Sequence, residues 1–382
     1  MIRIPSMILI GATGRNVGKT EFACALIHRL ADHQPVIAAK VTVIRETGSH
    51  CPRGGEGCGV CGSLQENYQI TEEHNRLSGK DTARMLQAGA SRVLWLRVRH
   101  ACMEEGARAL LARLPERVPL ICESNSLREI VTPGQFIVVR DGRSSAVKET
   151  CRRIMPLANR LIDFDGSGWN IQPDEITFSQ GQWWWRMNAT AVILAGGKSR
   201  RMGQDKSLLP FNGRPMLVHI ANQLRPHFEA ILVGANDPER YGIGGPPVIA
   251  DRIPGQGPLM GLASCLEAAT TDTIFLTGCD IPTMDIPTLH AMLATLANHD
   301  AVIPVTADGR HPLFAFYRRT ILPTIQATLA DGKRRMEDLL QRLNVATFPL
   351  ADNTWFRNLN TPEDYAAACA AAEQPEEHRS DP

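Results

Sequence analysis

The sequence lacks several features that would assign it to a class at once. None of its uncharged apolar runs approaches the roughly 18 residues that a membrane-spanning helix needs. The first residues, MIRIPSMILIGATG, contain one basic side chain and run into a glycine-rich loop instead of a small-residue cleavage site. They therefore do not resemble a signal peptide. We expect no membrane partner.

The chain also has almost no net charge. Lys and Arg total 41 against 40 Asp and Glu, which gives +1 at pH 7. Proteins that bind polyanions carry a clear basic excess, so we expect no nucleic-acid partner. Hydrophobic residues make up 43% and charged residues 21% of the chain. This balance is ordinary for a soluble globular protein and excludes a mostly disordered or collagen-like chain.

Ten cysteines are present although the sequence shows no signal peptide. Thiols in such a chain are typical of a reducing compartment, where they are buried, reactive or bound to metal instead of paired. We therefore expect a cytoplasmic protein.

Two glycine-rich loops each follow a short apolar run. The first run, at 7–10, leads to Gly18-Lys19-Thr20, and the second, at 191–195, leads to Gly196-Gly197. A buried strand followed by such a loop is typical of the start of an α/β unit. At roughly 150 residues per domain, 382 residues suggest two or three domains. We predict two tandem three-layer α/β domains.

Composition suggests where the domains end. We assign residues 1–165 to the first domain, 166–186 to a linker, 187–372 to the second domain and 373–382 to a disordered tail. The linker is rich in Gly, Gln and polar residues and lacks helical periodicity. Its tryptophan run, 183–185, is interpreted as pinning the segment onto a domain face by burial. The alternative is that these rings stack on a pterin or a base.

The first loop has the composition of a phosphate-binding loop. Gly14, Gly18, Lys19 and Thr20 precede an amphipathic run at 21–30 that predicts a helix. Backbone N–H groups and a helix N-terminus bind phosphate oxygens. Lysine would neutralise the β- and γ-phosphates, and the threonine hydroxyl would bind Mg²⁺. The alternative is an ordinary tight turn.

A further apolar run, at 118–122, predicts a buried strand that ends at Glu123. This carboxylate would hold the water shell of the metal, or is a solvated loop acid. Together these features resemble the P-loop NTPases of the MobB and dethiobiotin-synthetase type. The resemblance rests mainly on the first 30 residues, and the loop departs from the usual glycine placement. It implies nucleotide binding and leaves the reaction open.

Three cysteines lie close together in the glycine-rich segment between residues 50 and 62. They are Cys51, Cys58 and Cys61, and the Cys-x2-Cys pair has the spacing of a metal knuckle. Tetrahedral Zn²⁺ would take His50 or His74 as its fourth ligand. Alternatively, three thiolates would hold an iron–sulfur cluster with one open iron. The remaining interpretation is a flexible loop of free or redox-active thiols.

The second glycine-rich loop combines glycines with positive charge. Gly196 and Gly197 allow backbone amides to approach a nucleoside triphosphate closely. Arg201 and Lys206 bring cations to the same phosphates. The alternative is a solvated basic loop, which this dense combination of glycines, Arg and Asp-Lys disfavours.

This loop and the motifs after it resemble the molybdenum cofactor guanylyltransferases of the MobA type. The loop reads GGxSxRMGxDK and continues as LLPFNGRPM. The later motifs follow in order: Asp251 with Gly257-Pro258-Leu259, the apolar run 273–277 leading to Asp280, the segment 311–317, and the segment 356–364 with Asn358 and Asn360. The resemblance covers about residues 188–370.

The resemblance implies a compact, mainly parallel Rossmann-like sheet of the nucleotidyltransferase (GT-A-like) type. It implies transfer of GMP from GTP to molybdopterin-bound molybdenum, with release of pyrophosphate. Positioning and charge neutralisation would carry most of the catalysis. GTP and molybdopterin are then substrates, and Mg²⁺ is the cofactor.

The resemblance also implies roles for individual residues. Asp280 would bind Mg²⁺, and Arg201 and Lys206 would stabilise the departing pyrophosphate. Asn358 and Asn360 would position the pterin phosphate or the metal. Guanine and ribose would be held by the following residues: Leu194, Ala195, Gly196, Gly197, Asp251, Gly257, Pro258 and Leu259. The alternatives are a turn carboxylate for Asp280 and a helix cap for Asn360.

Other functions stay open at this point. The pair Gly196-Gly197 favours GTP, but a cytidylyltransferase of the same family is the nearest alternative. A sugar-1-phosphate nucleotidyltransferase shares the first glycine loop, although the short ending and the lack of a C-terminal extension disfavour it. A GTP-dependent adaptor would deliver the cofactor to molybdoenzyme apo-proteins or their chaperones, with the phosphate loop as a switch.

Overall fold

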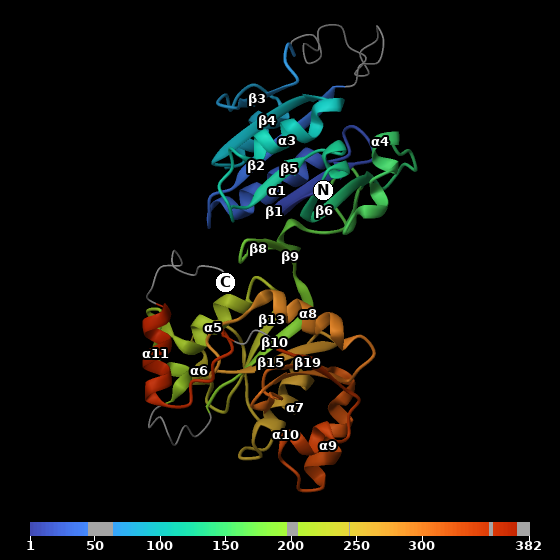
Figure 1. Ribbon diagram of the computed structural model, residues 1–382. Helices are drawn as coiled ribbons and strands as arrows, with labels where there is room; N and C mark the ends of the chain where they lie inside the picture. The colour runs from blue at the N-terminus through green and yellow to red at the C-terminus, as the bar shows by residue number, and fades with distance from the viewer. Residues whose placement is uncertain (45–63, 197–204, 244, 351–353, 373–382) are drawn as a thin grey trace. The chain divides into compact units, whose positions relative to one another are not determined.

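The computed structural model describes residues 1–44, 64–196, 205–243, 245–350 and 354–372. The chain divides into two compact units, Met1–Trp185 and Arg186–Pro382 (Figure 1). Both are α/β, as predicted. Among the described residues, no helix has the length and apolar character to cross a membrane.

Unit 1 is built around a sheet of seven described strands in the order β3-β4-β2-β5-β1-β6-β7. All neighbours are parallel except β3 and β4. The strands are β1 (Ile2–Ala12), β2 (Ile37–Ile44), β3 (Tyr68–Glu72), β4 (Arg92–Arg99), β5 (Leu120–Glu123), β6 (Val131–Asp141) and β7 (Arg160–Phe164). The helices are α1 (Lys19–Ala31), α2 (Asp81–Gln87), α3 (Met103–Leu111) and α4 (Glu149–Arg152), with short turns η1 (His100–Cys102), η2 (Ser126–Glu129), η3 (Met155–Leu157) and η4 (Pro173–Glu175).

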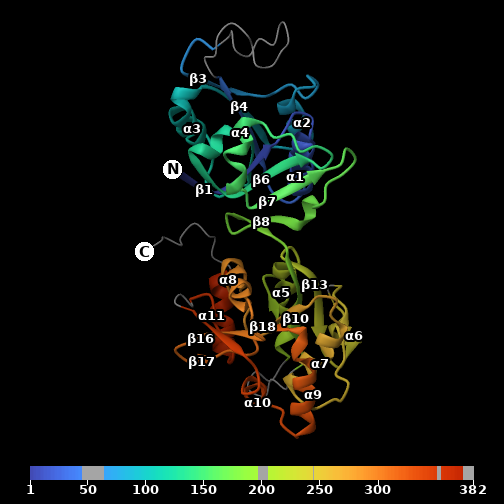
Figure 2. The ribbon, with the colours of Figure 1, turned by 90° about the vertical axis from the view of Figure 1, so that its right-hand side faces the viewer.

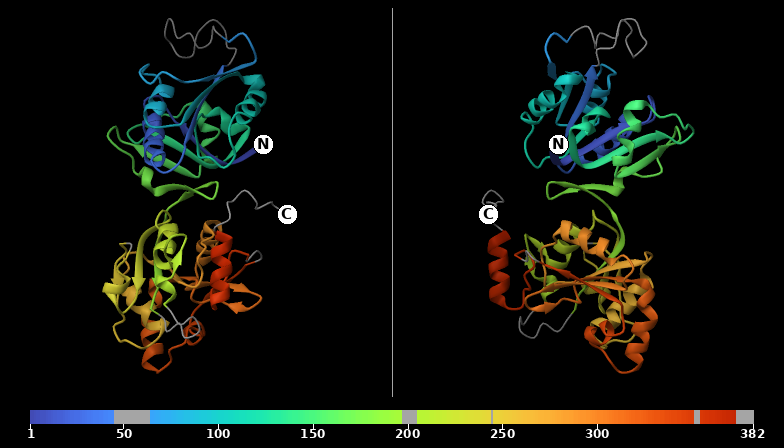
Figure 3. Two further views of the ribbon diagram at one scale, coloured as in Figure 1. Left: turned by 90° about the vertical axis from the view of Figure 1, so that its left-hand side faces the viewer. Right: turned by 45° about the vertical axis from the view of Figure 1, so that its right-hand side comes forward.

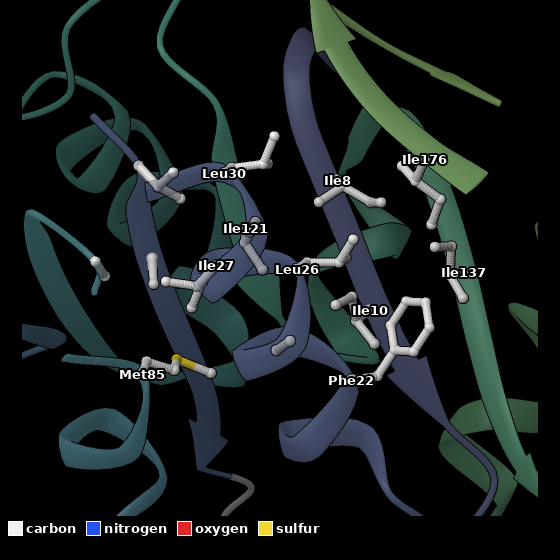
Figure 4. Close-up of a cluster of buried hydrophobic side chains, with 14 of the residues drawn as sticks. Ile8, Ile10, Phe22, Leu26, Ile27, Leu30, Met85, Ile121, Ile137 and Ile176 are labelled. Atoms are coloured by element: carbon white, nitrogen blue, oxygen red, sulfur yellow. The ribbon is translucent and has the colours of Figure 1, made fainter. Parts of the chain in front are cut away.

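Helices cover both faces of this sheet because β1 is buried on both. Ile8 and Ile10 pack with α1 and α2, while Met7 and Leu9 pack with α3 and α4. Figure 4 shows the first of these clusters, with Phe22 and other α1 side chains turned toward the strands. Alternating side chains of one strand thus supply two cores, which makes the unit three-layered.

The segment expected as a linker belongs to unit 1. Residues 176–185 form a hairpin of β8 (Ile176–Ser179) and β9 (Gln182–Trp185), and β9 contacts β1 and β6 (Figure 2). Ile176, Phe178 and Trp183 join the α1 core. The prediction of a linker at 166–186 was therefore wrong, because Gly and Gln content concealed the alternation of buried side chains along two short strands.

Trp183 explains the tryptophan run in packing terms. Its ring is 1% exposed, and its Nε1 donates a hydrogen bond of 2.7 Å to the carbonyl of Ser6. Trp184 is half-buried, and its Nε1 bonds to Ser179 within the hairpin. The position of Trp183 agrees with burial rather than with ligand stacking.

Unit 2 is built around a sheet with the described order β14-β13-β10-β15-β18-β16-β17, and β19 pairs with β16. Its strands are β10 (Met187–Leu194), β13 (Phe228–Gly234), β14 (Val248–Ile249), β15 (Thr273–Gly278), β16 (Ala301–Thr306), β17 (Gly309–Arg310), β18 (Ala315–Arg318) and β19 (Val345–Pro349), with a separate hairpin of β11 (Pro210–Phe211) and β12 (Arg214–Pro215). The helices are α5 (Met216–Leu224), α6 (Pro238–Tyr241), α7 (Pro258–Ala268), α8 (Ile286–Leu296), α9 (Leu322–Ala330), α10 (Met336–Leu340) and α11 (Pro362–Ala372), with short turns η5 (Lys206–Leu208) and η6 (Arg319–Ile321).

The sheet of unit 2 is mixed: its described strands form four parallel and three antiparallel pairs. β10, β13, β14 and β15 are parallel neighbours, whereas β18 runs antiparallel to both β15 and β16. Helices α7, α9 and α10 contribute to a core on one face. Helices α5 and α8 also contact the strands, and α11 lies at the periphery of the unit (Figure 3).

We predict that Trp183→Ala lowers the free energy of unfolding of unit 1 by about 3–5 kcal/mol, because it empties a buried site. Trp184→Ala is the matched control and should cost less, since that ring is half-buried. Urea denaturation of the full chain measures both. Equal, small losses for the two variants would instead support a loosely attached hairpin.

Candidate active site

A cavity of about 730 Å³ opens where three parallel strands of unit 2 end. Leu194, Gly234 and Gly278 end β10, β13 and β15, and Leu194 is in register with both glycines. The chain leaves β10 first toward β13 and later returns on the other side as β15. Open α/β sheets bind ligands at the carboxyl ends of strands where this reversal occurs.

Two glycines make room for the side chain of Leu194. A Cβ on Gly234 would lie 2.7 Å from Leu194 Cδ2, and a Cβ on Gly261 would lie 3.1 Å from the same atom. Leu194 and both glycines line the cavity. A larger residue at either glycine would therefore move the wall of the cavity.

Asp280 lies two residues beyond β15 and lines the cavity. A Cβ on Gly278 would lie 2.7 Å from Asp280 Oδ1, so the carboxylate occupies space that only glycine leaves free. The carbonyl of Asp280 accepts a hydrogen bond of 2.8 Å from the backbone N–H of Leu359. Gly278 thus leaves room for the carboxylate, and the segment before α11 holds the main chain of Asp280.

A second cavity, of about 450 Å³, is linked to the first. It is lined by Asn358 and Asn360, and Lys206 Nζ donates a 3.4 Å hydrogen bond to Asn360 Oδ1. Lys206 itself lines the first cavity. This contact and the bond from Leu359 to Asp280 connect residues that line one cavity to residues that line the other.

His311, from the fourth motif of the sequence, also lines the second cavity. Its Nε2 is 2.8 Å from Thr306 Oγ1, and its ring meets the edge of Phe356 at 4.7 Å between centroids. Burial lowers the pKa of His311 below its ordinary value. The ring is therefore a neutral hydrogen-bonding group at neutral pH.

Asn236 is a site residue that sequence reasoning missed. It lines the first cavity, donates a 2.9 Å hydrogen bond to Asp251 Oδ2, and accepts one of 2.8 Å from the backbone N–H of Asp251. The signal was available, because Asn236 lies two residues beyond the apolar run of β13. Only the pairing of β13 with β10 shows that Asn236 lies at the same edge of the sheet as the second glycine-rich loop.

The structure sorts the predicted residues into three groups. The first cavity is lined by these predicted residues: Leu194, Ala195, Gly196, Lys206, Asp251, Gly257, Pro258 and Asp280. Gly197 and Arg201 lie outside the described residues. Leu259 is fully buried in the core on the α7 face and does not line the cavity, so its side chain cannot contact a ligand there.

The first glycine-rich loop lies at the corresponding point of the sheet of unit 1, between β1 and α1. Gly18 is left-handed, with φ of 75°, and a Cβ there would lie 2.7 Å from the ring of Phe164. Lys19 and Thr20 begin α1. Lys19 Nζ lies 3.3 Å from Glu123 Oε2, and the Glu123 side chain is fully buried.

A second ion pair lies near the first. Lys40, in β2, pairs with Asp81 at the start of α2. Burial would raise the pKa of Asp81, but the hydrogen bond and charge of Lys40, together with the charge of Lys19, hold it below its ordinary value. Lys40 is in register with Glu123, which ends β5, so the two ion pairs bring alternating charges together beside the start of α1.

The cysteine loop cannot be placed. Cys51, Cys58, Cys61 and His50 all lie outside the described residues, and His74 is exposed. Within the described ranges, no group of three or more His, Cys, Asp or Glu side chains could hold a metal ion.

Comparisons with known proteins find relatives of unit 2. A family model described as a MobA-like NTP transferase domain matches residues 191–347. A probable molybdenum cofactor guanylyltransferase of Synechococcus elongatus is 39% identical over 190 residues, which cover 47% of this chain and 98% of that protein. A probable molybdenum cofactor guanylyltransferase of Carboxydothermus hydrogenoformans is 34% identical over 185 residues, which cover 47% and 93%.

A crystal structure of molybdopterin-guanine dinucleotide biosynthesis protein A from Archaeoglobus fulgidus matches with a TM-score of 0.42 and 23% identity, covering 48% of this chain and 97% of that chain. The sequence matches and the site of unit 2 define a nucleotidyltransferase. The chain belongs to the MobA-like NTP transferase family. Residues 1–190 lie outside the family match, so this assignment concerns unit 2.

We predict that Gly278→Ala lowers the rate of nucleotidyl transfer at least about 100-fold, the loss expected when an electrostatic group is misplaced. The new methyl group would displace the Asp280 carboxylate. Gly168→Ala is the control, since a Cβ there meets nothing within 4 Å. Pyrophosphate release measures the rate, and unchanged release from Gly278→Ala would contradict the role of Asp280.

Proposed function

We propose that unit 2 transfers GMP from GTP to molybdopterin-bound molybdenum, forming the guanine dinucleotide cofactor and pyrophosphate. The observation that carries the proposal is the pair of linked cavities, one at the strand ends and one at Asn358 and Asn360. A reaction between two large substrates requires two adjoining sites. The names of the two guanylyltransferase relatives support this choice of substrates.

The larger cavity suits the nucleotide. Its walls include Gly196, Gly234 and Gly257, which let backbone groups approach a ligand closely. The Asn236–Asp251 pair offers an amide and a carboxylate that would form hydrogen bonds with the base or with the hydroxyls of the ribose. The Gly196-Gly197 pair resembles the guanylyl branch of the family and is the basis for preferring GTP to CTP.

The smaller cavity suits the pterin substrate. Asn358 and Asn360 would hold its phosphate, and His311 offers a neutral ring beside them. In the reaction, a terminal phosphate oxygen forms a bond to the α-phosphorus of GTP, and the bond from that phosphorus to pyrophosphate breaks. Lys206, which contacts Asn360, lies between the two substrates and would balance the charge that develops.

The donor set fits Mg²⁺ at Asp280. Mg²⁺ is usually held by one or two carboxylates together with substrate phosphates, and Asp280 supplies one carboxylate in a cavity that otherwise offers glycines and a lysine. When bound there, Mg²⁺ would neutralise phosphate charge. The position of the carboxylate is set by Gly278 and Leu359.

We expect Asp280→Asn to lower kcat for pyrophosphate release by at least about 100-fold while leaving the fold intact. Asp272→Asn is the matched control, because Asp272 is an exposed carboxylate just before the other end of β15. The assay supplies Mg-GTP with and without molybdopterin, and Mg-CTP in parallel. Faster turnover of CTP would favour a cytidylyltransferase. Nucleotide hydrolysis that needs no molybdopterin and changes only affinity for apo-proteins would favour an adaptor.

For unit 1 we propose that residues 11–20 bind the phosphates of a nucleoside triphosphate. Support comes from left-handed Gly18, from Lys19 and Thr20 at the start of α1, and from Glu123 beside them. Neither Glu123 oxygen accepts a hydrogen bond within the described part of the chain, although both are buried. Apart from the ion pair with Lys19, this buried carboxylate has no donor within the described part of the chain, which is costly. The water shell of a Mg²⁺ ion held by Thr20 and the phosphates would supply donors.

We expect calorimetry with Mg-GTP to detect two binding steps in the full chain and only one in Lys19→Ala. Loss of the lysine should weaken the unit 1 site at least about 10-fold, since hydrogen bonds to charged groups contribute about 1.5–3 kcal/mol. Lys333→Ala, at an exposed lysine of unit 2, is the control for charge. The same titration with Mg-ATP tests base preference. Two unchanged steps in Lys19→Ala with both nucleotides would refute the site.

A further inference from the structure

Asp205, in the second glycine-rich loop, is not a free carboxylate in the cavity. Its Oδ1 accepts a 3.1 Å hydrogen bond from the backbone N–H of Ser207, which caps the short turn η5. Its Oδ2 accepts from the hydroxyl of Tyr241 and lies 3.1 Å from Arg240 Nη2. Both oxygens are therefore used within the protein, and the side chain is 12% exposed.

The turn capped by Asp205 begins with Lys206, which lines the first cavity and bonds to Asn360 of the second. Ser207 forms a side-chain hydrogen bond with the thiol of Cys279, next to Asp280. The direction of the Lys206 side chain thus depends on how Asp205 is held.

Tyr241, at the end of α6, is the residue that holds Asp205. Tyr241 is 4% exposed, and α6 is itself capped by Asp237, which accepts from the backbone N–H of Arg240. Burial and the neighbouring Asp205 raise the pKa of Tyr241 to about 12, so the hydroxyl stays protonated and donates. This buried donor is directed at the carboxylate that caps η5.

The same hydroxyl also lies near Gly196, the last described residue before residues 197–204. Gly196 has φ of 87°, and a Cβ on it would lie 3.3 Å from the Tyr241 oxygen and 3.5 Å from its ring. Gly196 and Asp205 flank residues 197–204 in the sequence. One hydroxyl from a separate helix therefore bonds to the first described residue after this segment and lies near the last described residue before it.

We propose that Tyr241 is a positioning residue of the active site. Its hydroxyl, which lies near Gly196, donates a hydrogen bond to Asp205 and so orients Lys206 between the two substrate cavities. The kinetic part of this inference rests on the proposed function. Nothing in the nucleotide-binding motif identifies Tyr241, which lies 35 residues beyond Lys206 in the sequence. It reaches the site because α6 follows β13, the neighbour of β10.

Tyr241→Phe removes the hydroxyl and keeps the ring. Hydrogen exchange of the full chain without any ligand, read by mass spectrometry, tests the positioning directly. We expect amide exchange at residues 205–209 to accelerate at least about 10-fold in Tyr241→Phe, because the cap on Ser207 loosens. Arg240→Ala, which removes only a half-exposed cation, should accelerate it less. Unchanged exchange in Tyr241→Phe overturns the proposal.

Tyr317→Phe is the matched control. It also removes a buried tyrosine hydroxyl, one that donates to Pro312, while β18 pairs with the beginning of β15 and not with its end. It should lower thermal stability without accelerating exchange at 205–209. If Tyr317→Phe accelerates this exchange as much as Tyr241→Phe, the effect is general loosening and the proposal fails.

Kinetics provide the second measurement. With Mg-GTP and molybdopterin, Tyr241→Phe should lower kcat about 10-fold and change KM for GTP less than about twofold, since Lys206 would act on developing charge. A rise in KM alone overturns the proposal. If the wild-type protein releases no pyrophosphate, the proposed function fails, while the exchange experiment still decides whether Tyr241 positions Asp205.

Discussion

The candidate active site of unit 2 depends on glycines at the ends of two strands, β13 and β15, and in helix α7. Gly234 and Gly261 leave space for Leu194, and Gly278 leaves space for the Asp280 carboxylate. Because β10 is in register with both β13 and β15, these positions meet at one point. A well-packed interior has little tolerance for an added methyl group. The cavity therefore keeps its shape only while these positions remain glycine.

Around that point, three segments distant in sequence support one another. The segment before α11 binds the backbone of Asp280 and the amine of Lys206. Helix α6 holds Asp205, and Asp251 is paired with Asn236. Each charged group that lines the cavity is thus oriented by a partner from another element. Such preorganised groups lose little energy to rearrangement when charge develops on a substrate, which is how electrostatic catalysis operates.

In unit 1, too, a glycine-rich loop follows a strand, β1, that has a parallel neighbour on each side. This unit also shows how composition can mislead a prediction of domain boundaries. Glycine, glutamine and polar residues dominate the stretch 166–186, and this composition predicts a linker. In the structure, Ile176 and Trp183 from this stretch complete the core against α1. A two-stranded hairpin needs only a few alternating apolar residues, and whether they are buried depends on the surface they meet.

Local order in the chain was sufficient to predict much of this protein. The strands before both glycine-rich loops, the helix after Lys19 and the placement of Asp280 beyond a buried strand all follow from patterns within about ten residues. What the tertiary structure decided are the pairings across the sheet. Asn236, Tyr241 and the burial of Leu259 could not be read from the sequence, because each depends on which strands are neighbours. Hydrophobic periodicity determines a segment's own conformation, whereas strand order is set by packing between distant segments.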